Sequence, residues 1–462
     1  MRIWLLTIGE PVPLGAGVRD RPHRTGALAR YLVARGHDVV WWTSAFDHFR
    51  KQHLAAEDTF LTEPDGLRIR LLRGCGYKRN VSLERFRDHR QVAERFRVLS
   101  ELDRTPEILI SALPTVEMCL AAEEYGQKNS VPTVVDLRDM WPDILADVAP
   151  KPLRPVAQLA LAPLFLKARR ACAQATALTG ITEEFVNWGL ARGRRVRGEF
   201  DRAFPFTYNP EQPAEEELRA ADAFWDGLGI WAKRADAGGD GTGQDGAGQE
   251  STGPNEFVVC YFGNIGVQLD LAHVIEAARL LEARGMRVRF VLCGAGERLE
   301  EYRNTARGLK SVVFPGWVNR AGIYSLMRRS CVGLDPLPER MDFLASINNK
   351  AIEYLSAGLP VVSSPERGVL YDLLKKTGSG VSYASHDAES LAGCIGKLAE
   401  DSEDFEAKLK PMREKAQGLF DREFRAEVVY PAMEAHLMAV RQEYRAGRVV
   451  VAKHKAAEGI TA

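Results

Sequence analysis

The chain has 462 residues, of which 45% are hydrophobic and 27% charged, so it is long enough for two domains of an ordinary globular protein. Basic and acidic side chains balance at 62 each, so nothing in the overall charge suggests a nucleic-acid partner. Basic residues are in excess within residues 1–205, which suits an anionic partner or membrane surface, or reflects only scattered surface arginines.

The cysteines and the apolar stretches of the sequence indicate in which compartment the protein would work. The seven cysteines lie far apart, without a CxxC motif or a Cys/His cluster, so the sequence predicts no zinc site. An odd cysteine count and an N-terminal apolar run too short for a signal peptide favour a reducing cytoplasm. The longest apolar stretch, residues 156–166, is too short to span a bilayer. It lies in a segment with Lys and Arg at both ends (151–170), which predicts either peripheral contact with an anionic membrane or a buried crossover helix.

Strand-like and helix-like segments alternate through the first part of the chain. Residues 24–36 have the periodicity of an amphipathic helix that ends at Gly36. Short apolar runs separated by helices predict a parallel sheet covered on both faces. We therefore expect an N-terminal Rossmann-like domain over residues 1–205. Its expected strands are 2–8, 37–44, 67–73, 107–113, 132–139 and 175–182.

The same alternation restarts at residue 257 and predicts a second Rossmann-like domain over residues 257–401, so the fold class is α/β with two tandem doubly wound domains. Residues 206–256 are expected to be a linker with a disordered Gly-rich insert, since that composition cannot bury enough apolar surface. Residues 402–462 are expected to be helical and to cross back to the first domain. The strands expected in the second domain are 257–266, 287–296, 311–317, 331–337 and 360–364.

Two glycine-containing turns follow strands of the second domain, where open α/β sheets bind their ligands. The first holds Gly263, Asn264 and Gly266, and the second holds Gly294 and Gly296. Glycine lets a backbone turn tightly and approach a phosphate closely, and a purely structural turn would have the same composition.

An aromatic residue follows the next expected strand. Trp317 and Val318 lie just beyond it, where a ring and backbone groups could hold a planar base. A buried structural tryptophan is the alternative.

The stretch SINNKAIEYLSAGLPVV (346–362) is the strongest local signal. Ser346 or Asn348 can cap a short helix, and Lys350 and Glu353 share one of its faces. The helix start with Lys350 would attract a phosphate, and a carboxylate at Glu353 would accept sugar or ribose hydroxyls. A surface ion pair is the alternative.

The first domain offers two candidates at the matching edge. A Gly/Pro-rich loop (9–26) carries Arg21 and Arg24, which would suit a second substrate. Arg138 and Asp139 lie at the end of an expected strand. They form either part of a functional site or a structural salt bridge.

Taken together, these stretches resemble the retaining glycosyltransferases of family 4, which have the GT-B fold, and look closest to the branch of bacterial cell-surface polysaccharide assembly. The resemblance covers nearly the whole chain apart from residues 211–256. It is carried by LTIGEPVP, RTGALARYLVARGHDVVWWTSAFDH, VPTVVDLRDMWPD, YFGNIG, CGAGE, FPGWV and NKAIEYLSAGLPVV, of which the last is the most specific.

The resemblance implies that a nucleotide-sugar binds in the cleft between the domains, held mainly by the second. Lys350 would lie near the diphosphate, Trp317 and Val318 at the base, and Glu353 would match the second glutamate of the Glu-(seven residues)-Glu motif, which touches the ribose. No cofactor and no metal are implied. The implied donor-binding residues are Gly263, Asn264, Gly266, Gly294, Gly296, Trp317, Val318, Asn349, Lys350 and Glu353.

The chain departs from the family pattern at two positions. The first motif glutamate is replaced by Ala345, and Arg138 stands where many members have a histidine. We assign Arg138, Asp139 and Lys350 to the reaction centre. Arg21 and Arg24 are assigned to the acceptor side.

The expected activity is that of a retaining, metal-independent glycosyltransferase, cytoplasmic or peripheral on the inner face of the plasma membrane. It would move a sugar from a nucleotide diphosphate, UDP being favoured, to a hydroxyl of a lipid-linked or saccharide acceptor. Two rivals stay open: a nucleotide-sugar C2 epimerase of the same fold, and a degenerate nucleotide-sugar-binding protein, which Ala345 suggests. The sugar, the base, the acceptor and the oligomeric state are left open.

Overall fold

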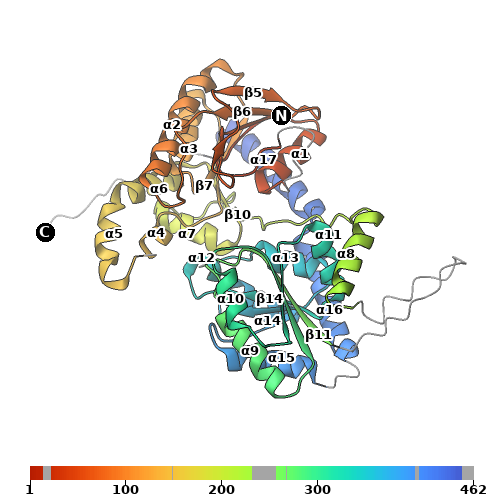
Figure 1. The fold of residues 1–462 in the computed structure, drawn as a ribbon. Helices are drawn as coiled ribbons and strands as arrows, with labels where there is room; N and C mark the ends of the chain where they lie inside the picture. The colour runs from red at the N-terminus through yellow and green to blue at the C-terminus, as the bar shows by residue number, and fades with distance from the viewer. Residues whose placement is uncertain (14–21, 148, 232–255, 267, 401–404, 450–462) are drawn as a thin grey trace, which may run out of the picture. The chain divides into compact units, whose positions relative to one another are not determined.

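The computed structural model describes residues 1–462 except 14–21, 148, 232–255, 267, 401–404 and 450–462 (Figure 1). The chain divides into two compact units, each built around its own sheet. Unit 1 comprises Met1–Pro205 and Glu427–Ala462, and unit 2 comprises Phe206–Ala426.

The described residues of unit 1 form an eight-stranded sheet in the order β10-β9-β8-β7-β1-β2-β6-β5. All neighbours pair in parallel except β5, which runs antiparallel to β6 at one edge. The strands are β1 (Arg2–Leu6), β2 (Asp38–Ser44), β5 (Thr59–Thr62), β6 (Arg68–Leu72), β7 (Ile108–Leu113), β8 (Thr133–Leu137), β9 (Ala177–Gly180) and β10 (Arg202–Ala203). A separate two-stranded sheet pairs β3 (Phe46–Asp47) with β4 (Gln52–His53).

Helices cover both faces of this sheet (Figure 1), and every residue of β7 is buried because the strand lies inside two helical layers. The rings of Trp4, Trp42, Phe96 and Tyr125 pack together in one part of the core. The helices are α1 (Arg24–Ala34), α2 (Leu83–Leu99), η1 (Ser100–Leu102), α3 (Val116–Asn129), α4 (Asp143–Asp147), η2 (Lys151–Leu153), α5 (Arg154–Ala160), α6 (Ala162–Gln174), α7 (Glu183–Gly193) and α17 (Ala426–Arg445).

The described residues of unit 2 form a six-stranded parallel sheet in the order β13-β12-β11-β14-β15-β16. The strands are β11 (Phe257–Phe262), β12 (Val288–Cys293), β13 (Val312–Gly316), β14 (Val332–Pro336), β15 (Val361–Ser364) and β16 (Gly380–Ser382). The helices are α8 (Glu215–Gly227), α9 (Ala272–Ala283), α10 (Leu299–Thr305), α11 (Arg320–Arg329), α12 (Met341–Leu344), α13 (Asn349–Ser356), α14 (Val369–Thr377), α15 (Ala388–Ala399) and α16 (Phe405–Glu423). The prediction of two doubly wound parallel sheets is therefore confirmed.

The segment expected to be a linker contains helix α8, which packs on α11 within unit 2. Trp225 is fully buried, and its Nε1 donates to the carbonyl of Gly322 at 2.9 Å. Arg329 of α11 pairs with Asp222 at 2.9 Å and with Asp226 at 2.5 Å. Residues up to Trp231 therefore extend unit 2 rather than link the two units. The Gly-rich insert expected to be disordered lies outside the described residues from 232 to 255.

The C-terminal segment returns to unit 1, as expected, in the form of a second helix. Helix α16 belongs to unit 2, whereas α17 lies beside α1 in unit 1 (Figure 1). Glu434 of α17 accepts a hydrogen bond from the Tyr31 hydroxyl at 2.8 Å and lies 2.8 Å from Nε2 of His37. These partly buried polar contacts fix the position of α17 against α1.

A buried histidine on α17 gives the fold a pH dependence. The ring of His436 packs against Phe204 and Phe200, with centroids 5.2 and 5.9 Å away. Burial, assisted by the charge of Arg202, lowers the pKa of His436 to about 4, although Asp201 opposes the shift. The unfolded chain takes up this proton near pH ~6.5. The stability associated with the neutral ring is therefore present above that pH and lost as the pH falls toward 4.

We expect His436→Gln to flatten the decline of Tm between pH 6.5 and pH 4, as measured by calorimetry. The decline should be reduced rather than abolished, because burial also lowers the pKa of His48 to about 4 and of His89 to about 3. A decline as steep in the variant as in the wild type would mean that the His436 ring is already protonated in the folded chain.

Candidate functional site

Helix α13 begins at a cap that also contacts the end of β14. The side-chain oxygen of Asn348 accepts from the backbone N–H of Ala351 at 3.0 Å, and its Nδ2 donates to Asp335 at 2.5 Å. Ile352 and Leu355 are buried, as their spacing predicts. The free N–H groups of the first turn therefore start at the carboxyl edge of the sheet, where a helix start favours an anion.

Lys350 connects this helix start to the first glycine loop. Its Nζ lies 3.9 Å from Oδ1 of Asp335, whose side chain is fully buried. Burial raises the pKa of Asp335, and Lys350 and Asn348 oppose that rise only in part. The Lys350 ammonium is also 5.8 Å from the ring centroid of Tyr261, at the end of β11. A Cβ added at Gly263 would lie 3.5 Å from Cδ of Lys350.

The two glycine turns pack directly on each other. The backbone N–H of Gly263 donates to the carbonyl of Cys293 at 3.1 Å. A Cβ added at Gly294 would lie 1.9 Å from the carbonyl oxygen of Gly263, and one at Gly296 would lie 2.2 Å from that of Ile265. Side chains cannot approach so closely, so Gly294 and Gly296 are required by the contact between the two loops.

The rest of the first turn presents a polar side chain to solvent. Asn264 is exposed, and its backbone carbonyl accepts from the hydroxyl of Tyr261 at 3.0 Å. Gly266 is buried, and a Cβ there would meet the Asn264 amide at 3.2 Å. The hydroxyl of Tyr261 thus stabilises the conformation of the first glycine turn. The sequence pattern did not identify this tyrosine.

The alternative interpretation of Trp317 as a buried structural tryptophan is wrong. Trp317 follows β13 and is 75% exposed, whereas Val318 is half-buried against the core of unit 2. An indole ring of this size usually buries most of its surface. An exposed tryptophan beyond a strand end has a free face on which a planar group can stack.

Two other predicted positions of this region differ in exposure. Asn349, the first residue of α13, is exposed, and Glu353 is half-buried one turn further along. Ala345, at the position of the missing motif glutamate, is 7% exposed and follows α12. A methyl group there offers no acceptor to a sugar hydroxyl.

In unit 1, Arg138 lies at the centre of a buried ion network. Its Nε donates to Asp136 at 2.6 Å, and its Nη1 contacts both Glu10 and Thr25. Arg24 donates from Nε to the same oxygen, Oδ2 of Asp136, at 2.9 Å, and from Nη2 to Oδ1 at 3.3 Å. Burial alone would raise the pKa of Asp136, but Arg24 and Arg138 outweigh it and hold the pKa well below its usual range.

The other site residues predicted in unit 1 are Arg24, Asp139 and Arg21, and they differ in burial and in the groups that they contact. Arg24 is 6% exposed, and its Nη1 donates to the carbonyl of Pro205 at 2.8 Å, so it supports the network from within. Asp139 is half-buried and acts electrostatically on Arg85. Arg21 lies outside the described residues.

A second cationic group in unit 1 was not predicted from the sequence. Lys51 and Arg85 lie over the ring of Tyr77, at 4.8 and 5.6 Å from its centroid, and Arg85 also lies 4.5 Å from the ring centroid of Trp141. Nδ1 of His48 is 2.6 Å from the hydroxyl of Tyr77. The cluster brings together loops that are distant in the sequence, so no local spacing could have revealed it.

Asp136 and Asp335 were also missed, although both leave a sequence signal. Each is the only charged residue of its strand, TVVDL or VGLDP. A carboxylate in a strand buried on both faces needs a cationic or hydrogen-bonding partner. Arg138 and Lys350 are those partners here.

Lys350 and the glycine turns lie in a part of the chain that matches a known family model. Residues 256–401 match the family model for glycosyl transferases group 1. No curated protein gives a significant match to the sequence of the chain.

Solved structures with the GT-B fold resemble the chain over almost its whole length. A sucrose-phosphate synthase from Thermosynechococcus elongatus has a TM-score of 0.63 at 16% identity, covering 96% of this chain and 99% of that one. Anabaena HepE in complex with UDP-glucose has a TM-score of 0.59 at 15% identity, covering 95% and 100%. The lipopolysaccharide outer core galactosyltransferase WaaB has a TM-score of 0.53 at 14% identity, covering 95% and 99%. At these identities the likeness establishes the fold, and the expected GT-B fold is confirmed.

Proposed function

We propose that the protein is a retaining glycosyltransferase that takes its sugar from a UDP-sugar and transfers it to a hydroxyl of a lipid-linked or saccharide acceptor in cell-surface polysaccharide synthesis. The proposal rests mainly on the position of Lys350, which lies at the capped start of α13 beside a tight glycine turn. It lies within the residues that match the group 1 glycosyl transferase model. Anabaena HepE, which has the same fold, was solved in complex with UDP-glucose, and this favours UDP as the donor nucleotide.

In the proposed reaction an acceptor hydroxyl oxygen forms a bond to the anomeric carbon while the bond from that carbon to the diphosphate oxygen breaks. The hydroxyl proton passes to the departing diphosphate. Lys350 and the N–H groups at the start of α13 meet the developing negative charge, which is stabilisation by donors already in place. No metal ion is required for that step. Trp317 and Val318 would contact the base, and Gly263, Asn264, Gly266 and Asn349 the diphosphate side.

On the acceptor side we assign an orienting role to the Arg138 network. Glu10 and Asp136 already neutralise Arg138, so it would donate hydrogen bonds rather than add net charge. Lys51 and Arg85 are cations that lie over the rings of Tyr77 and Trp141, and they favour an acceptor that carries a negative group, such as the phosphate of a lipid carrier. Asp139 would lie at the reaction centre, with Arg21 and Arg24 on the acceptor side.

A thermal-shift panel of UDP, GDP, ADP and CMP tests the donor part of the proposal. A ligand at 100 times its Kd stabilises the folded chain by about 2.7 kcal/mol, which gives a clear rise in Tm. We expect UDP to raise Tm more than the other three nucleotides. Equal shifts for all four, or none for UDP, would contradict a UDP-sugar donor.

We expect Glu353→Gln to weaken the binding of the UDP-sugar by roughly 1.5–3 kcal/mol, because a neutral amide loses the charge that strengthens hydrogen bonds to hydroxyls. Calorimetric titration with the UDP-sugar measures this change, and UDP alone serves as the comparison. Tm without ligand should stay near the wild-type value. Unchanged affinity in the variant would remove Glu353 from the donor site.

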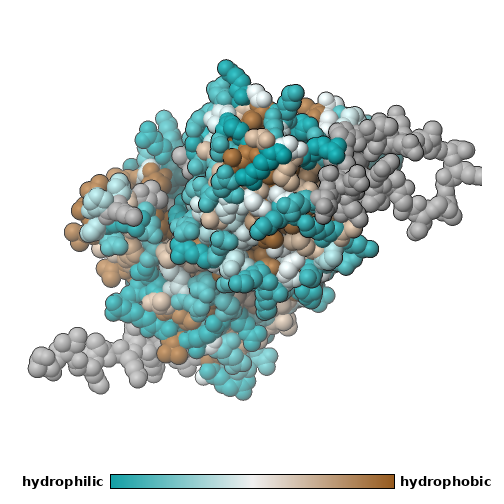
Figure 2. All heavy atoms as spheres, turned by 90° about the horizontal axis from the view of Figure 1, so that it is seen from below, coloured by the Kyte–Doolittle hydropathy of each residue, from teal (hydrophilic) through white to brown (hydrophobic). Residues whose placement is uncertain are grey.

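We also propose that the α5–α6 segment, two consecutive helices joined by Leu161 alone, binds an anionic membrane surface. None of the described residues of α5 is buried, which rules out the buried crossover helix for this part, although α6 buries one face. Apolar side chains gather over the α5–α6 segment at the left edge of Figure 2. Among the described residues, no helix combines the length and the apolarity needed to cross a bilayer. The exposed apolar side chains are Leu153 at 55%, Val156 at 65%, Leu159 at 77% and Leu166 at 64%.

Flotation with vesicles that contain anionic lipid tests whether the α5–α6 segment binds a membrane. The wild-type chain should float at low salt and less at high salt, because surface attraction weakens with ionic strength. Val156→Asp combined with Leu159→Asp should abolish flotation, since it places two carboxylates in the headgroup region. Val196→Asp is the matched control, because Val196 is 90% exposed in unit 1 outside the α5–α6 segment. Flotation of the double variant at the wild-type level would disprove the assignment.

A further inference from the structure

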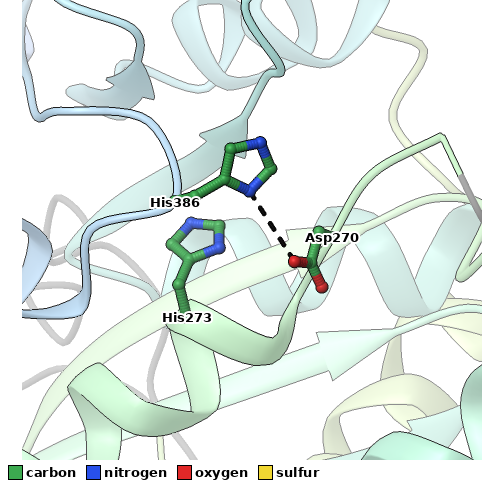
Figure 3. Close-up of side chains that lie close together, drawn as sticks. All are labelled: Asp270, His273 and His386. Carbon is green, nitrogen blue, oxygen red and sulfur yellow. Dashed lines mark ion pairs between the residues drawn. The ribbon is translucent and has the colours of Figure 1, made fainter. Parts of the chain in front are cut away.

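Three side chains with metal-ligand chemistry meet in unit 2. Asp270 precedes α9, His273 lies in its first turn, and His386 lies between β16 and α15 (Figure 3). Each offers one ligand atom, and these atoms all lie within 4.8 Å of one another. Nδ1 of His386 is 3.6 Å from Oδ2 of Asp270. Two loops that follow carboxyl ends of strands thus bring an imidazole–imidazole–carboxylate set together.

The buried histidine of this set has an unused ring nitrogen. His273 is 7% exposed, and its Nε2 lies 2.9 Å from the hydroxyl of Tyr383. Its Nδ1 is buried and forms no hydrogen bond of normal geometry with any described residue, although the backbone of Asp270 is close enough to act on the ring. If Nε2 carries the proton and donates it to Tyr383, the lone pair of Nδ1 is available as a ligand. A second partner that fixes the tautomer in this way is typical of metal-binding histidines.

The carboxylate is held in a similar way. Oδ1 of Asp270 accepts from the hydroxyl of Tyr302 at 3.0 Å and from Nη1 of Arg298 at 3.3 Å, which leaves Oδ2 on the side of His386. The charge of Arg298 is itself matched by Glu301, with Nη2 and Oε1 2.7 Å apart. The Asp270 side chain is therefore oriented by neighbours that do not compete for Oδ2.

We propose that Asp270, His273 and His386 bind a divalent transition metal ion, with Zn²⁺ as the best match to two imidazoles and one carboxylate. Ligand atoms bound tetrahedrally at 2.0–2.1 Å lie about 3.4 Å apart. The 3.6 Å between His386 and Asp270 is already close to that spacing. All separations in the set are within 4.8 Å, and the side chain of His386, which is 53% exposed, has room to rotate toward the other two ligands. Three protein ligands leave the fourth position to water or a small ligand.

Such an ion would join the loop between β11 and α9 to the loop between β16 and α15. The first of these loops begins with the glycine turn at Gly263, so the ion would restrain that turn from its far end. The site contains no residue assigned to the donor, and the proposal stands apart from the proposed glycosyltransferase activity. The sequence predicted no zinc site, because the ligands come from segments that only the fold brings together.

Metal binding can be measured on the full chain after treatment with a chelating resin. Competition with a chromogenic zinc indicator gives the stoichiometry and affinity, and Co²⁺ in the same site gives a visible absorption band that reports four-coordination. We expect one Zn²⁺ per wild-type chain. His386→Ala should lower the affinity at least tenfold without unfolding the chain, because His386 is exposed. Tyr383→Phe, which removes the partner of His273, should lower it about 10–100-fold.

His23→Ala is the matched control, since His23 is an exposed histidine of unit 1. It should bind Zn²⁺ as the wild type does. Zn²⁺ should also raise Tm of the wild type and of His23→Ala but not of His386→Ala. The proposal would be overturned if the wild type bound less than one equivalent of Zn²⁺, or if His386→Ala bound it as tightly as the wild type.

Discussion

Lys350→Ala is expected to lower kcat for sugar transfer by about 10²–10³-fold, with a smaller change in the affinity for the donor. The reason is that the negative charge on the diphosphate grows as the glycosidic bond breaks, so a fixed cation stabilises the transition state more than the ground state. Steady-state kinetics with a UDP-sugar and an acceptor separate the two effects. An unchanged kcat would place the departing diphosphate elsewhere.

The structure adds a second consequence of the same substitution. Without Lys350, the fully buried carboxylate of Asp335 loses its cationic neighbour at 3.9 Å and keeps only its hydrogen bond from Asn348. A buried group left without its partner costs roughly 1–3 kcal/mol, so Tm should fall. The double variant Lys350→Ala with Asp335→Asn should recover Tm but not turnover. Recovery of turnover in that double variant would mean that the loss came from stability alone.

Arg138→Ala is expected to destabilise unit 1 by about 3–5 kcal/mol, because it takes the cation from Glu10 and leaves the buried Asp136 paired with Arg24 alone. Asp136 is fully buried, and Glu10 is 10% exposed at its side chain. Urea denaturation at neutral pH measures the change. The double variant Arg138→Met with Glu10→Gln should be less destabilised than Arg138→Ala, since it removes the carboxylate charge that is left without a cation. Equal stability of Arg138→Ala and wild type would show that the network is not coupled to folding.

The pH dependence of that difference follows from the sign of the shift at Asp136. Arg24 and Arg138 lower its pKa, so the associated stability is present above the ordinary aspartate value of ~3.9 and lost as the pH falls below it. The gap between the wild type and Arg138→Ala should therefore be widest at neutral pH and narrow in acid. A gap independent of pH would assign the loss to packing instead of charge.

The fold was predictable because strands that are buried on both faces, such as β7 and β11, consist almost entirely of apolar residues. The same rule could not find β5, whose residues alternate between half-buried and exposed at an antiparallel edge. It could not find β16 either, which has three residues and none of them buried. The sequence predicts a linker where the structure has helix α8, because the acidic first turn of this helix gives no sign of the buried Trp225 that anchors it.

The site was predictable in position and less so in detail. The cap at Asn348 and the buried Ile352 and Leu355 followed from spacing alone. Spacing could not show that Gly294 is required by another loop, or that Trp317 is exposed, because both facts depend on neighbours distant in the sequence. The family 4 assignment, the polysaccharide pathway and the roles of individual site residues stay predictions.

The most direct test of a retaining UDP-sugar transferase is the anomeric configuration of its product, determined by NMR after incubation with a panel of UDP-sugars and of lipid-linked and saccharide acceptors. We predict release of UDP that depends on the acceptor, and a product bond with the same configuration as the donor bond. Inverted configuration would contradict a retaining mechanism. Conversion of the donor sugar at C2 without an acceptor would indicate an epimerase, and binding of UDP-sugar without turnover would indicate a binding protein.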